Sequence, residues 1–286
     1  MKKAKNDSPL ISVITVCLNA AEFIEQAIQS VLSQTYPHLE YIVIDGGSAD
    51  GTVEIIRKYE SRLDYWHSQS DRGLAHAFNL GLSQAHGDWI LFLNADDFFI
   101  NPSVIDQVIP YLRTNETADV VYGQVELVTC EKKPKLVPFS QVLGRPWNWL
   151  IFCWKNIIPH QAAFTNINYF KKVGFFDEQH NIALEYEHYL RVGRNLQAVF
   201  VPVLISRMRK GGVSNKNIIK ILMGFREAQI KNNSMPAIFV WSAFYFQIFR
   251  CYGGIFLHAI LDPLAGKINL AHRNTGKSLS NIAIEK

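Results

Sequence analysis

Residues 71–97 read DRGLAHAFNLGLSQAHGDWILFLNADD, and this stretch predicts a helix followed by a buried strand. Residues 89–93 are an unbroken apolar run, which is typical of a strand covered on both faces. Two adjacent carboxylates, Asp96 and Asp97, follow that strand directly. The expected helix carries small or apolar residues at the spacing of one helical face, namely Leu74, Ala77, Phe78, Gly81 and Ala85. The stretch therefore predicts a helix and a strand that end in an acidic loop.

The same alternation of strands and helices extends toward both ends of the chain. Further strands are expected at residues 11–16, 41–44 and 63–67, and further helices at residues 23–32, 53–59 and 101–109. Four strands that alternate with helices indicate an α/β fold with a mostly parallel sheet flanked by helices. At 286 residues and 48% hydrophobic composition, the chain can bury such a core. These values exclude a disordered or fibrous protein.

Polar residues follow each expected strand at the point where the strand ends. They are Asn19 after the first strand, residues 45–48 after the second, residues 70–72 after the third and residues 94–97 after the fourth. Because ligands bind outside the carboxyl ends of the strands in such sheets, we expect these loops to form a ligand site. A helix cap is the alternative for any single loop, for example at Ser48 or Asp50. A dinucleotide site is excluded, because the glycines after the second strand do not match G-x-G-x-x-G.

The adjacent carboxylates of Asp96 and Asp97 predict a bound cation. Two neighbouring negative charges repel each other unless a cation neutralises them or both reach water. Oxygen ligands suit Mg²⁺ or Mn²⁺, and Mg²⁺ is often held by one or two carboxylates together with substrate phosphates. The interpretation is a metal-bound diphosphate at the edge of the sheet. An ordinary exposed pair of aspartates at a strand end is the alternative.

Four stretches resemble the family 2 glycosyltransferases with a GT-A fold. They are SVITVCLNA at residues 12–20, LEYIVIDGGSADGT at 39–52, the stretch at 71–97, and the segments HQAAF, VGFFDE and LEYEHYLR between residues 160 and 191. The resemblance spans residues 9–195 and is nearest to the non-processive transferases of bacterial cell-surface polysaccharides, such as those of colanic acid and O-antigen. It implies a metal-dependent, inverting transfer of a sugar from a nucleotide-diphosphate donor to a saccharide acceptor. No Q-x-x-R-W motif occurs, which argues against a processive synthase.

The resemblance implies a set of nucleotide-sugar contacts at the matching positions. Residues 94–97 match the D-x-D segment of the family, in which Asp96 faces the ribose or the metal and Asp97 binds the metal, Mg²⁺ or Mn²⁺. Asn94 stands where relatives often have aspartate, which removes one negative charge. The implied contacts to the nucleotide sugar are Thr15, Val16, Leu18, Asn19, Asp45, Gly46, Asp71, Arg72, Asn79, Asn94, Ala95 and Asp96.

Inverting transfer also requires a general base that removes the proton of the acceptor hydroxyl. The family's base lies near the start of a helix that continues into an arginine, and residues 184–191 match this pattern with Glu185 at the position of the base. Glu187 is the rival, although it is also spaced to pair with the arginine that ends the motif. His160 and Gln161 are implied to lie on the acceptor side. A structural hydrogen-bonding role is the alternative for His160.

Charge is distributed unevenly along the chain, whose net charge is +4. Residues 1–203 hold 17 Lys and Arg against 22 Asp and Glu, whereas residues 204–286 hold 12 against 3. We therefore expect a catalytic domain at 1–203 and a basic, hydrophobic helical region at 204–286, associated with the membrane. Residues 218–229 predict a helix with one apolar face and a basic remainder, which can lie on an anionic membrane surface.

Residues 237–261 form the most apolar part of this C-terminal region. Arg250 interrupts them, so shallow insertion into one face of the membrane is favoured over a membrane span. Packing on the catalytic domain or on a dimer partner is the alternative.

These features predict an enzyme at a membrane surface. The basic N-terminus lacks the features of a signal peptide, so we expect a cytoplasmic protein that is peripheral on the inner face of the bacterial plasma membrane. The expected partners are the nucleotide-diphosphate sugar, a lipid-linked saccharide acceptor and the membrane. Nucleic acid is not expected, because the aromatic residues cluster apart from most of the cations. The sequence is compatible with both a monomer and a homodimer. The alternative function is a nucleotide-sugar binding protein without turnover, motivated by Asn94 and Glu185.

Overall fold

The computed structural model describes the chain in five ranges, which are residues 8–131, 133–136, 142–180, 182–210 and 218–249. The chain divides into two compact units, Met1–Pro236 and Ala237–Lys286. The first unit contains the sheet and helices α1 to α8, and in the second unit residues 237–249 are helical. No helix within these five ranges is both long and apolar enough to cross a membrane.

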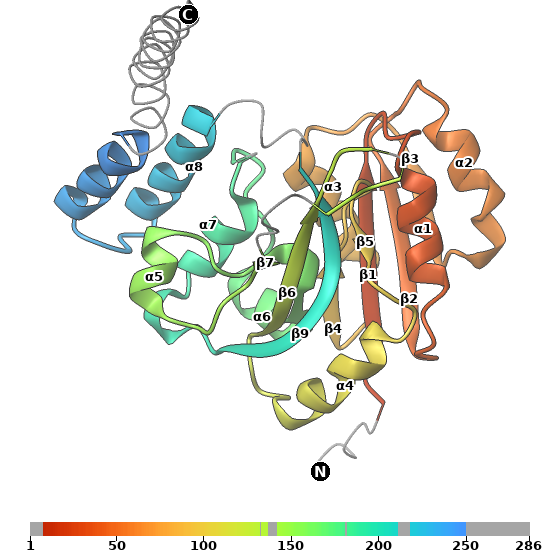
Figure 1. The fold of residues 1–286 in the computed structure, drawn as a ribbon, viewed down its shortest axis with the longest axis horizontal. Coiled ribbons are helices and arrows are strands. Elements are labelled where there is room, and N and C mark those ends of the chain that lie inside the picture. The colour runs from red at the N-terminus through yellow and green to blue at the C-terminus, as the bar shows by residue number, and fades with distance from the viewer. Residues whose placement is uncertain (1–7, 132, 137–141, 181, 211–217, 250–286) are drawn as a thin grey trace, which may run out of the picture. The chain divides into compact units, whose positions relative to one another are not determined.

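The first unit is built on a nine-stranded sheet (Figure 1). Eight strands follow the order β3-β2-β1-β4-β8-β6-β9-β5, and β7 pairs with β6 outside this path. The strands are β1 Ile11–Cys17, β2 Leu39–Asp45, β3 Tyr65–Ser68, β4 Trp89–Phe92, β5 Phe98–Phe99, β6 Val120–Val128, β7 Val142–Leu143, β8 Ala163–Asn166 and β9 Ala198–Arg209.

The four strands predicted from the sequence form a parallel half of the sheet. β1 lies between β2 and β4, and β3 lies beyond β2, all in parallel register. The register pairs Cys17 with Asp45 at the carboxyl ends, which brings the polar loops to one edge. The other half is mixed, because β8 runs antiparallel to both β4 and β6, whereas β9 runs parallel to β6. The complete sheet is therefore a mixed α/β sheet rather than a mostly parallel one.

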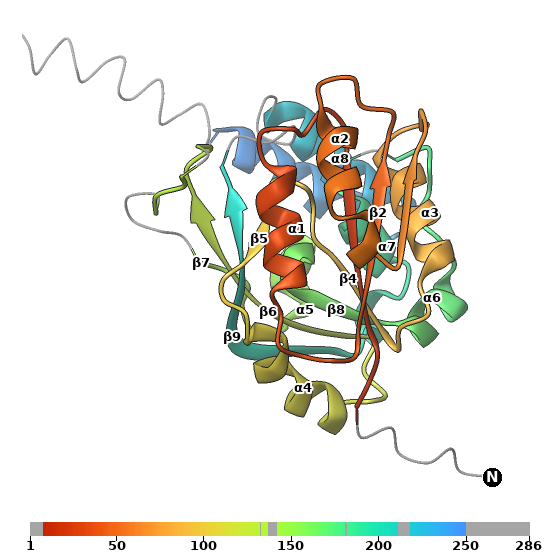
Figure 2. The same ribbon diagram turned by 90° about the vertical axis from the view of Figure 1, so that its right-hand side faces the viewer.

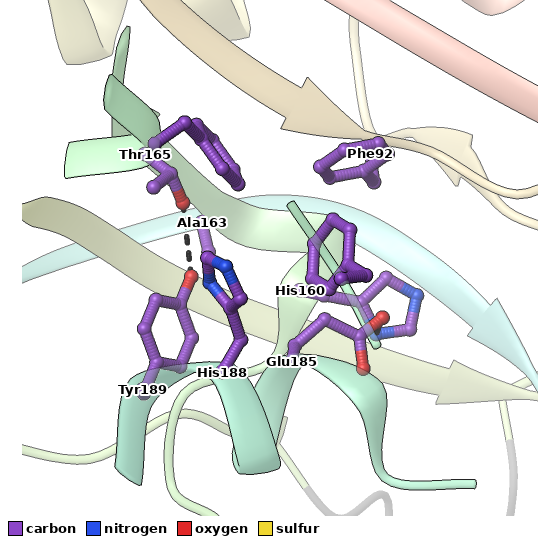
Figure 3. A pocket seen from close by; sticks show the side chains of 9 residues that line it. Phe92, His160, Ala163, Thr165, Glu185, His188 and Tyr189 are labelled. Atoms are coloured by element: carbon purple, nitrogen blue, oxygen red, sulfur yellow. Dashed lines mark hydrogen bonds and ion pairs between the residues drawn. The ribbon is translucent and has the colours of Figure 1, made fainter. Parts of the chain in front are cut away.

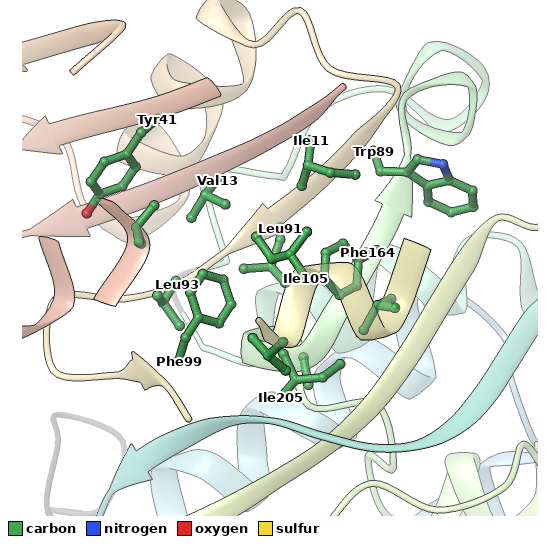
Figure 4. Close-up of a cluster of buried hydrophobic side chains, with 14 of the residues drawn as sticks. Ile11, Val13, Tyr41, Trp89, Leu91, Leu93, Phe99, Ile105, Phe164 and Ile205 are labelled. Carbon is green, nitrogen blue, oxygen red and sulfur yellow. The ribbon is translucent and has the colours of Figure 1, made fainter. Parts of the chain in front are cut away.

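Helices cover both faces of this sheet (Figures 1 and 2). They are α1 Ile24–Leu32, α2 Thr52–Lys58, α3 Leu74–Gln84, α4 Val104–Thr114, α5 Trp149–Trp154, α6 Ile167–Val173, α7 Leu184–Leu190 and α8 Ile218–Lys231. Side chains alternate along β1. Val13 belongs to the apolar cluster that includes residues of α1, α2 and α4 on one face, part of which Figure 4 shows, and Ile14 belongs to the cluster that includes residues of α3, α6 and α7 on the other. Both faces of the sheet are buried under helices, which explains the unbroken apolar runs of the strands.

Gly81 allows α3 to approach the sheet closely. A Cβ atom at this position would lie 2.4 Å from Ile14 Cγ2 on β1. Any larger residue would push the helix outward. The close packing holds the C-terminal half of α3 against β1 and β2.

The structure moves the predicted domain boundary from residue 203 to residue 236. Residue 203 lies in the middle of β9, which pairs with both β6 and β5. A division there would cut a strand of the central sheet. The change in net charge after residue 203 did not mark the boundary between the two units, because several Lys and Arg residues after this position belong to the first unit.

The apolar face of α8 packs against protein in this structure, which corrects its prediction as a membrane face. The Phe225 ring meets the Tyr186 ring of α7 with 4.7 Å between centroids, and Gln229 Nε2 donates to the Tyr186 hydroxyl at 2.9 Å. Gly224 lies against Ile182, where a Cβ atom would be 2.8 Å from Ile182 Cγ2. An amphipathic pattern looks the same whether its apolar face meets lipid or protein, so the sequence did not distinguish them.

The helix of the second unit exposes large apolar side chains. Ile238 and Phe249 are each 73% exposed, and Phe239 is 58% exposed. These side chains belong to the start of the apolar stretch at residues 237–261, whose shallow membrane insertion stays a prediction. Residues 250–261, including Arg250, lie outside the described ranges.

Candidate active site

The loops after β1 and β2 are joined into one edge by hydrogen bonds. The Asn19 backbone N–H donates to Ser48 Oγ at 2.7 Å, and the Ala49 N–H donates to Asn19 Oδ1 at 3.0 Å. Asn19 has a φ of 49°, a left-handed conformation that asparagine tolerates better than most residues. Leu18 beside it is 57% exposed. The two loops thus meet at the carboxyl edge of the sheet, as predicted.

Asp45 is buried at the end of β2 and shapes its loop. Its carboxylate accepts hydrogen bonds from the Ser48 N–H at 2.9 Å, the Gly47 N–H at 3.1 Å and Ser68 Oγ at 2.7 Å. Burial alone would raise the pKa of Asp45, but the bonds from Ser48 and Ser68 outweigh it and hold the pKa below its usual value. Both carboxylate oxygens therefore have partners within the protein.

Gly46 lets the loop after β3 lean on the loop after β2. A Cβ atom on Gly46 would lie 2.6 Å from Asp71 Oδ2, so a side chain there would displace the carboxylate. Asp71 is also held by the Gly73 N–H, which donates to its Oδ1 at 2.8 Å. A third predicted loop thus converges on the same edge.

Asn79 has a structural role, which corrects the predicted nucleotide contact. Its Nδ2 donates to the Phe176 carbonyl at 3.0 Å, and its Oδ1 accepts from the Phe176 N–H at 2.9 Å. Both ends of the amide are therefore used to fasten the 174–178 turn to α3. Arg72 strengthens the same junction, because its Nη2 bonds Glu178 Oε2 at 2.8 Å.

Replacing Asn79 with alanine is expected to lower the free energy of unfolding by about 1–3 kcal/mol, because two backbone groups of Phe176 lose their partners. The affinity for a nucleotide sugar is expected to be unchanged. Urea unfolding and calorimetric titration of the donor measure the two quantities. Asn168→Ala, at an exposed position of α6, is the matched control. A large loss of donor affinity at unchanged stability would contradict the structural role.

Two further predicted contacts lie inside the sheet. Thr15 is fully buried and its Oγ1 lies 3.0 Å from the Tyr41 hydroxyl, while Val16 is 5% exposed. The Val16 carbonyl accepts from the Ala95 N–H at 3.3 Å. The side chains of Thr15 and Val16 therefore pack below the edge, and the expected contact of this segment with the nucleotide, through its backbone groups, stays a prediction. The same bond holds Ala95, which is 5% exposed, beside the end of β1.

Asp97 is almost fully buried, yet one of its carboxylate oxygens has no partner. The residue is 1% exposed, and its Oδ1 lacks a hydrogen bond among the described residues. Burial and the neighbouring charge of Asp96 together raise the pKa of Asp97 well above its usual value, against the opposing hydrogen bond from the Gln161 side chain. Gln161 is 4% exposed and is therefore a support of Asp97 rather than the predicted acceptor contact.

Arg209 is a residue of this site that the sequence did not indicate. It is 2% exposed at the end of β9, and its Nη1 donates to the Asp96 carbonyl at 2.6 Å. Its guanidinium lies over the rings of Phe23 and Phe98, at 4.6 and 5.0 Å from their centroids. The sequence counts Arg209 with the basic tail, and only the strand pairing brings it to the two carboxylates.

The carboxylate pair fits a divalent cation that takes its other ligands from the substrate. In the part of the chain that the structure describes, no group of three or more His, Cys, Asp or Glu side chains could hold a metal ion. Asp97 Oδ1 is an orphaned acceptor, and a cation would supply the missing partner. Mg²⁺ commonly binds in this way, through one or two carboxylates and phosphate oxygens.

His160 connects the carboxylate loop to Glu185 (Figure 3). Asn94 Nδ2 lies 3.0 Å from His160 Nε2, and His160 Nδ1 lies 3.3 Å from Glu185 Oε1. The amide nitrogen can only donate, so Nε2 accepts and Nδ1 carries the proton that faces Glu185. Residues 94, 160 and 185 thus form one chain of polar contacts, and His160 has a polar role on the Glu185 side of the site.

Glu187 is committed to a buried ion pair. It is 1% exposed and bonds Arg191 Nη2 at 2.7 Å, and Lys231 Nζ from α8 lies 3.1 Å from its Oε1. Burial would raise the pKa of Glu187, but Arg191 and the other partners hold it below the usual value. The predicted pairing with Arg191 is present, although it is buried rather than at the surface.

A cavity of about 10 Å³ lies below Glu185, lined mainly by aromatic rings and by His188 on α7 (Figure 3). His188 Nε2 donates to the Gly174 carbonyl at 2.8 Å. Burial, helped by the charge of Arg191, lowers the pKa of His188 from 6.5 to about 4. The imidazole is therefore neutral near pH 7, and it forms part of the lining of this cavity.

The neutral His188 predicts a loss of stability in mild acid. Unfolded His188 takes up a proton below pH 6.5 and folded His188 only below about pH 4, so stability falls as the pH decreases through this window. The expected contribution is about 3 kcal/mol. Urea unfolding at several pH values measures it, and His188→Gln should flatten the profile. An equally steep fall in this variant would contradict the assignment.

Comparisons with known proteins identify the family. The model of glycosyl transferase family 2 matches residues 12–182. An uncharacterised glycosyltransferase of Mycobacterium tuberculosis is 30% identical over 211 residues, which are 73% of this chain and 78% of that protein.

Solved structures support the fold. The mannosyltransferase PcManGT of Pyrobaculum calidifontis, in complex with GDP-Man and Mn²⁺, matches with a TM-score of 0.63 at 18% identity, over 94% of this chain and 83% of that one. TarS 1–349 of S. aureus, in complex with UDP-GlcNAc, matches with a TM-score of 0.63 at 17% identity, over 85% and 73% of the two chains. With its mixed α/β sheet of GT-A type, the chain belongs to glycosyl transferase family 2.

Proposed function

We propose that this glycosyltransferase is an inverting, metal-dependent enzyme that transfers a sugar from a nucleotide-diphosphate donor to a lipid-linked saccharide. The observation that carries the proposal is the chain of polar contacts from Asn94 through His160 to Glu185. It joins the loop of the two aspartates to the carboxylate of Glu185 on α7. The leaving diphosphate needs a group that stabilises its charge, and the attacking hydroxyl needs a base that removes its proton.

Glu185 is the proposed general base. Its side chain is 13% exposed and forms no ion pair with an Arg or Lys of the described residues, in contrast to Glu187. His160 holds the Glu185 carboxylate through its Nδ1 proton, which orients the oxygen that receives the proton of the acceptor. Asp97, with Asp96, would hold Mg²⁺ or Mn²⁺, and the bound ion would supply charge stabilisation for the departing diphosphate.

The relatives support this donor class. GDP-Man and UDP-GlcNAc occupy the two solved structures with the same fold. In this chain, the loops at Asn19, Asp71 and Asp96 meet at one edge of the sheet, where such a donor would bind. The exposed apolar helix at residues 237–249 supports a peripheral position on the inner face of the plasma membrane, where a lipid-linked acceptor is found.

The direct test is transfer with radiolabelled nucleotide sugars, Mn²⁺ or Mg²⁺, and lipid extracts of bacterial membranes as acceptors. The anomeric configuration of the product, read by NMR, should be opposite to that of the donor. A protein that binds the donor but neither hydrolyses nor transfers it would support the alternative of a binding protein without turnover. Retention of the donor's configuration would contradict the assigned base.

A further inference from the structure

Helix α5, which packs beside α7, presents apolar side chains to solvent. Leu150 is 64% exposed, Ile151 is 46% exposed and Trp154 is 43% exposed, whereas Phe152 and Cys153 on the opposite side are buried. The helix is well formed, since Asn148 caps it by accepting from the Ile151 N–H at 3.0 Å. Exposed apolar groups on one side of a short helix point to a surface that meets another apolar phase.

The chain around α5 carries only positive charge. Residues 132–176 contain seven Lys and Arg and no Asp or Glu. Of these, two are exposed near α5: Arg145, four residues before the helix begins, and Lys155, directly after it ends. The turn Gly193–Asn195, with exposed Arg194, lies against the same helix, since a Cβ atom on Gly193 would be 3.9 Å from Trp149 Cη2. The apolar face is thus bordered by cations.

α5 packs directly against α7, the helix that carries Glu185 (Figure 1). The Phe152 and Tyr186 rings pack with 4.9 Å between centroids, and the Tyr186 hydroxyl donates to the Cys153 carbonyl at 3.1 Å. Tyr186 follows Glu185 in the chain. Whatever binds the outer side of α5 is therefore two helices away from the proposed base.

We infer that α5 docks on an anionic lipid surface, with Leu150 and Ile151 entering the headgroup layer and Arg145, Lys155 and Arg194 facing the lipid phosphates. Apolar side chains bordered by Lys and Arg are the pattern of interfacial membrane helices. A second copy of this chain would place cations against cations, which disfavours a symmetric contact. This surface lies in the first unit and includes no residue of 237–286.

The docking has a consequence for the acceptor, and this part rests on the proposed function. A lipid-linked saccharide presents its sugar a short distance from the membrane surface. With α5 on the lipid, α7 would hold Glu185 close to that surface. The orientation of the first unit on the membrane would then be set by α5, and the apolar helix at residues 237–249 would add only affinity for the membrane.

The test uses the full chain and hydrogen exchange followed by mass spectrometry. Vesicles of phosphatidylcholine with phosphatidylglycerol should slow exchange in peptides covering 149–155, and vesicles of phosphatidylcholine alone should not. Protection confined to the C-terminal region would overturn the proposal. Concentration-dependent protection of α5 without vesicles would also overturn it, since that result identifies an interface between copies.

Two variants test the same surface by vesicle sedimentation. Leu150→Glu with Ile151→Glu should weaken binding to anionic vesicles roughly tenfold. Lys155→Gln should weaken it about fivefold. Leu136→Glu, at a leucine that is 52% exposed, is the matched control and should bind as the wild type does. Equal binding of the double variant and the control would contradict the inference.

Failure of the docking is distinguishable from failure of the proposed transfer. The α5 variants should keep the wild-type rate of donor hydrolysis, while transfer to a lipid-linked acceptor in vesicles falls. Protection of α5 in a protein that transfers no sugar would leave the docking intact and refute only the activity.

Discussion

Asp97→Asn is expected to lower the kcat of sugar transfer by about a thousandfold, because the buried carboxylate that would hold the metal loses its charge. The two side chains are nearly equal in size, so packing is preserved. Asp97 is 1% exposed beside Asp96, and an ionised group there costs stability. The free energy of unfolding at pH 7 is therefore expected to rise, by about 1–2 kcal/mol. Opposite changes in rate and stability are the signature of a functional carboxylate.

Initial rates at saturating donor and metal, together with urea unfolding, measure both effects. Calorimetric titration of the donor with and without Mn²⁺ should show that the metal strengthens donor binding in the wild type and not in the variant. Glu116→Gln, at an exposed position of the turn after α4, is the control and should change neither quantity. A variant with the wild-type rate would remove Asp97 from the site.

Glu185→Gln is expected to lower kcat by roughly 10²–10⁴-fold with little change in donor affinity, because the amide cannot accept the proton of the acceptor. The His160 Nδ1 proton can still donate to the oxygen of the glutamine side chain, so the pocket keeps its shape. Stability should change by less than about 1 kcal/mol, since the side chain is not part of a buried ion pair with Arg or Lys in the described structure.

Glu187→Gln on the same helix is the matched control, with the opposite expectation. It leaves Arg191 and Lys231 without their buried partner, at a cost of about 3–5 kcal/mol in unfolding free energy. The rate per folded molecule should stay within a few-fold of the wild type. If Glu187→Gln abolishes transfer and Glu185→Gln does not, the assignment of the base is reversed.

Local periodicity was sufficient for the parallel half of the fold. The apolar runs that begin at Ile11, Tyr41 and Trp89 became β1, β2 and β4, and the face of Gly81 became the buried side of α3. The polar loops after these strands do meet at one edge. These features depend on neighbours in sequence and on the topology of parallel strands, which a single chain reveals.

The features that the sequence did not predict depend on partners far along the chain. Asn79 binds the backbone of Phe176, Gln161 supports Asp97, and α8 packs on Tyr186. In each case the residue type allowed two roles, one toward a ligand or lipid and one toward protein. Only the folded structure decides between them, because hydrogen-bond partners outside the local segment are invisible to periodicity.

The contacts of Arg209 impose an order on the assembly of the site during synthesis. Arg209 bonds the side chain of Gln26, 183 residues earlier, and the carbonyl of Asp96, 113 residues earlier. β5, directly after the two aspartates, gains its strand partner only when β9 arrives. A nascent chain that has left the ribosome only as far as about residue 100 therefore has most of the donor-binding loops but lacks the Arg209 guanidinium that secures them. Because such long-range contacts form late, synthesis must proceed as far as Arg209 before the donor site can close.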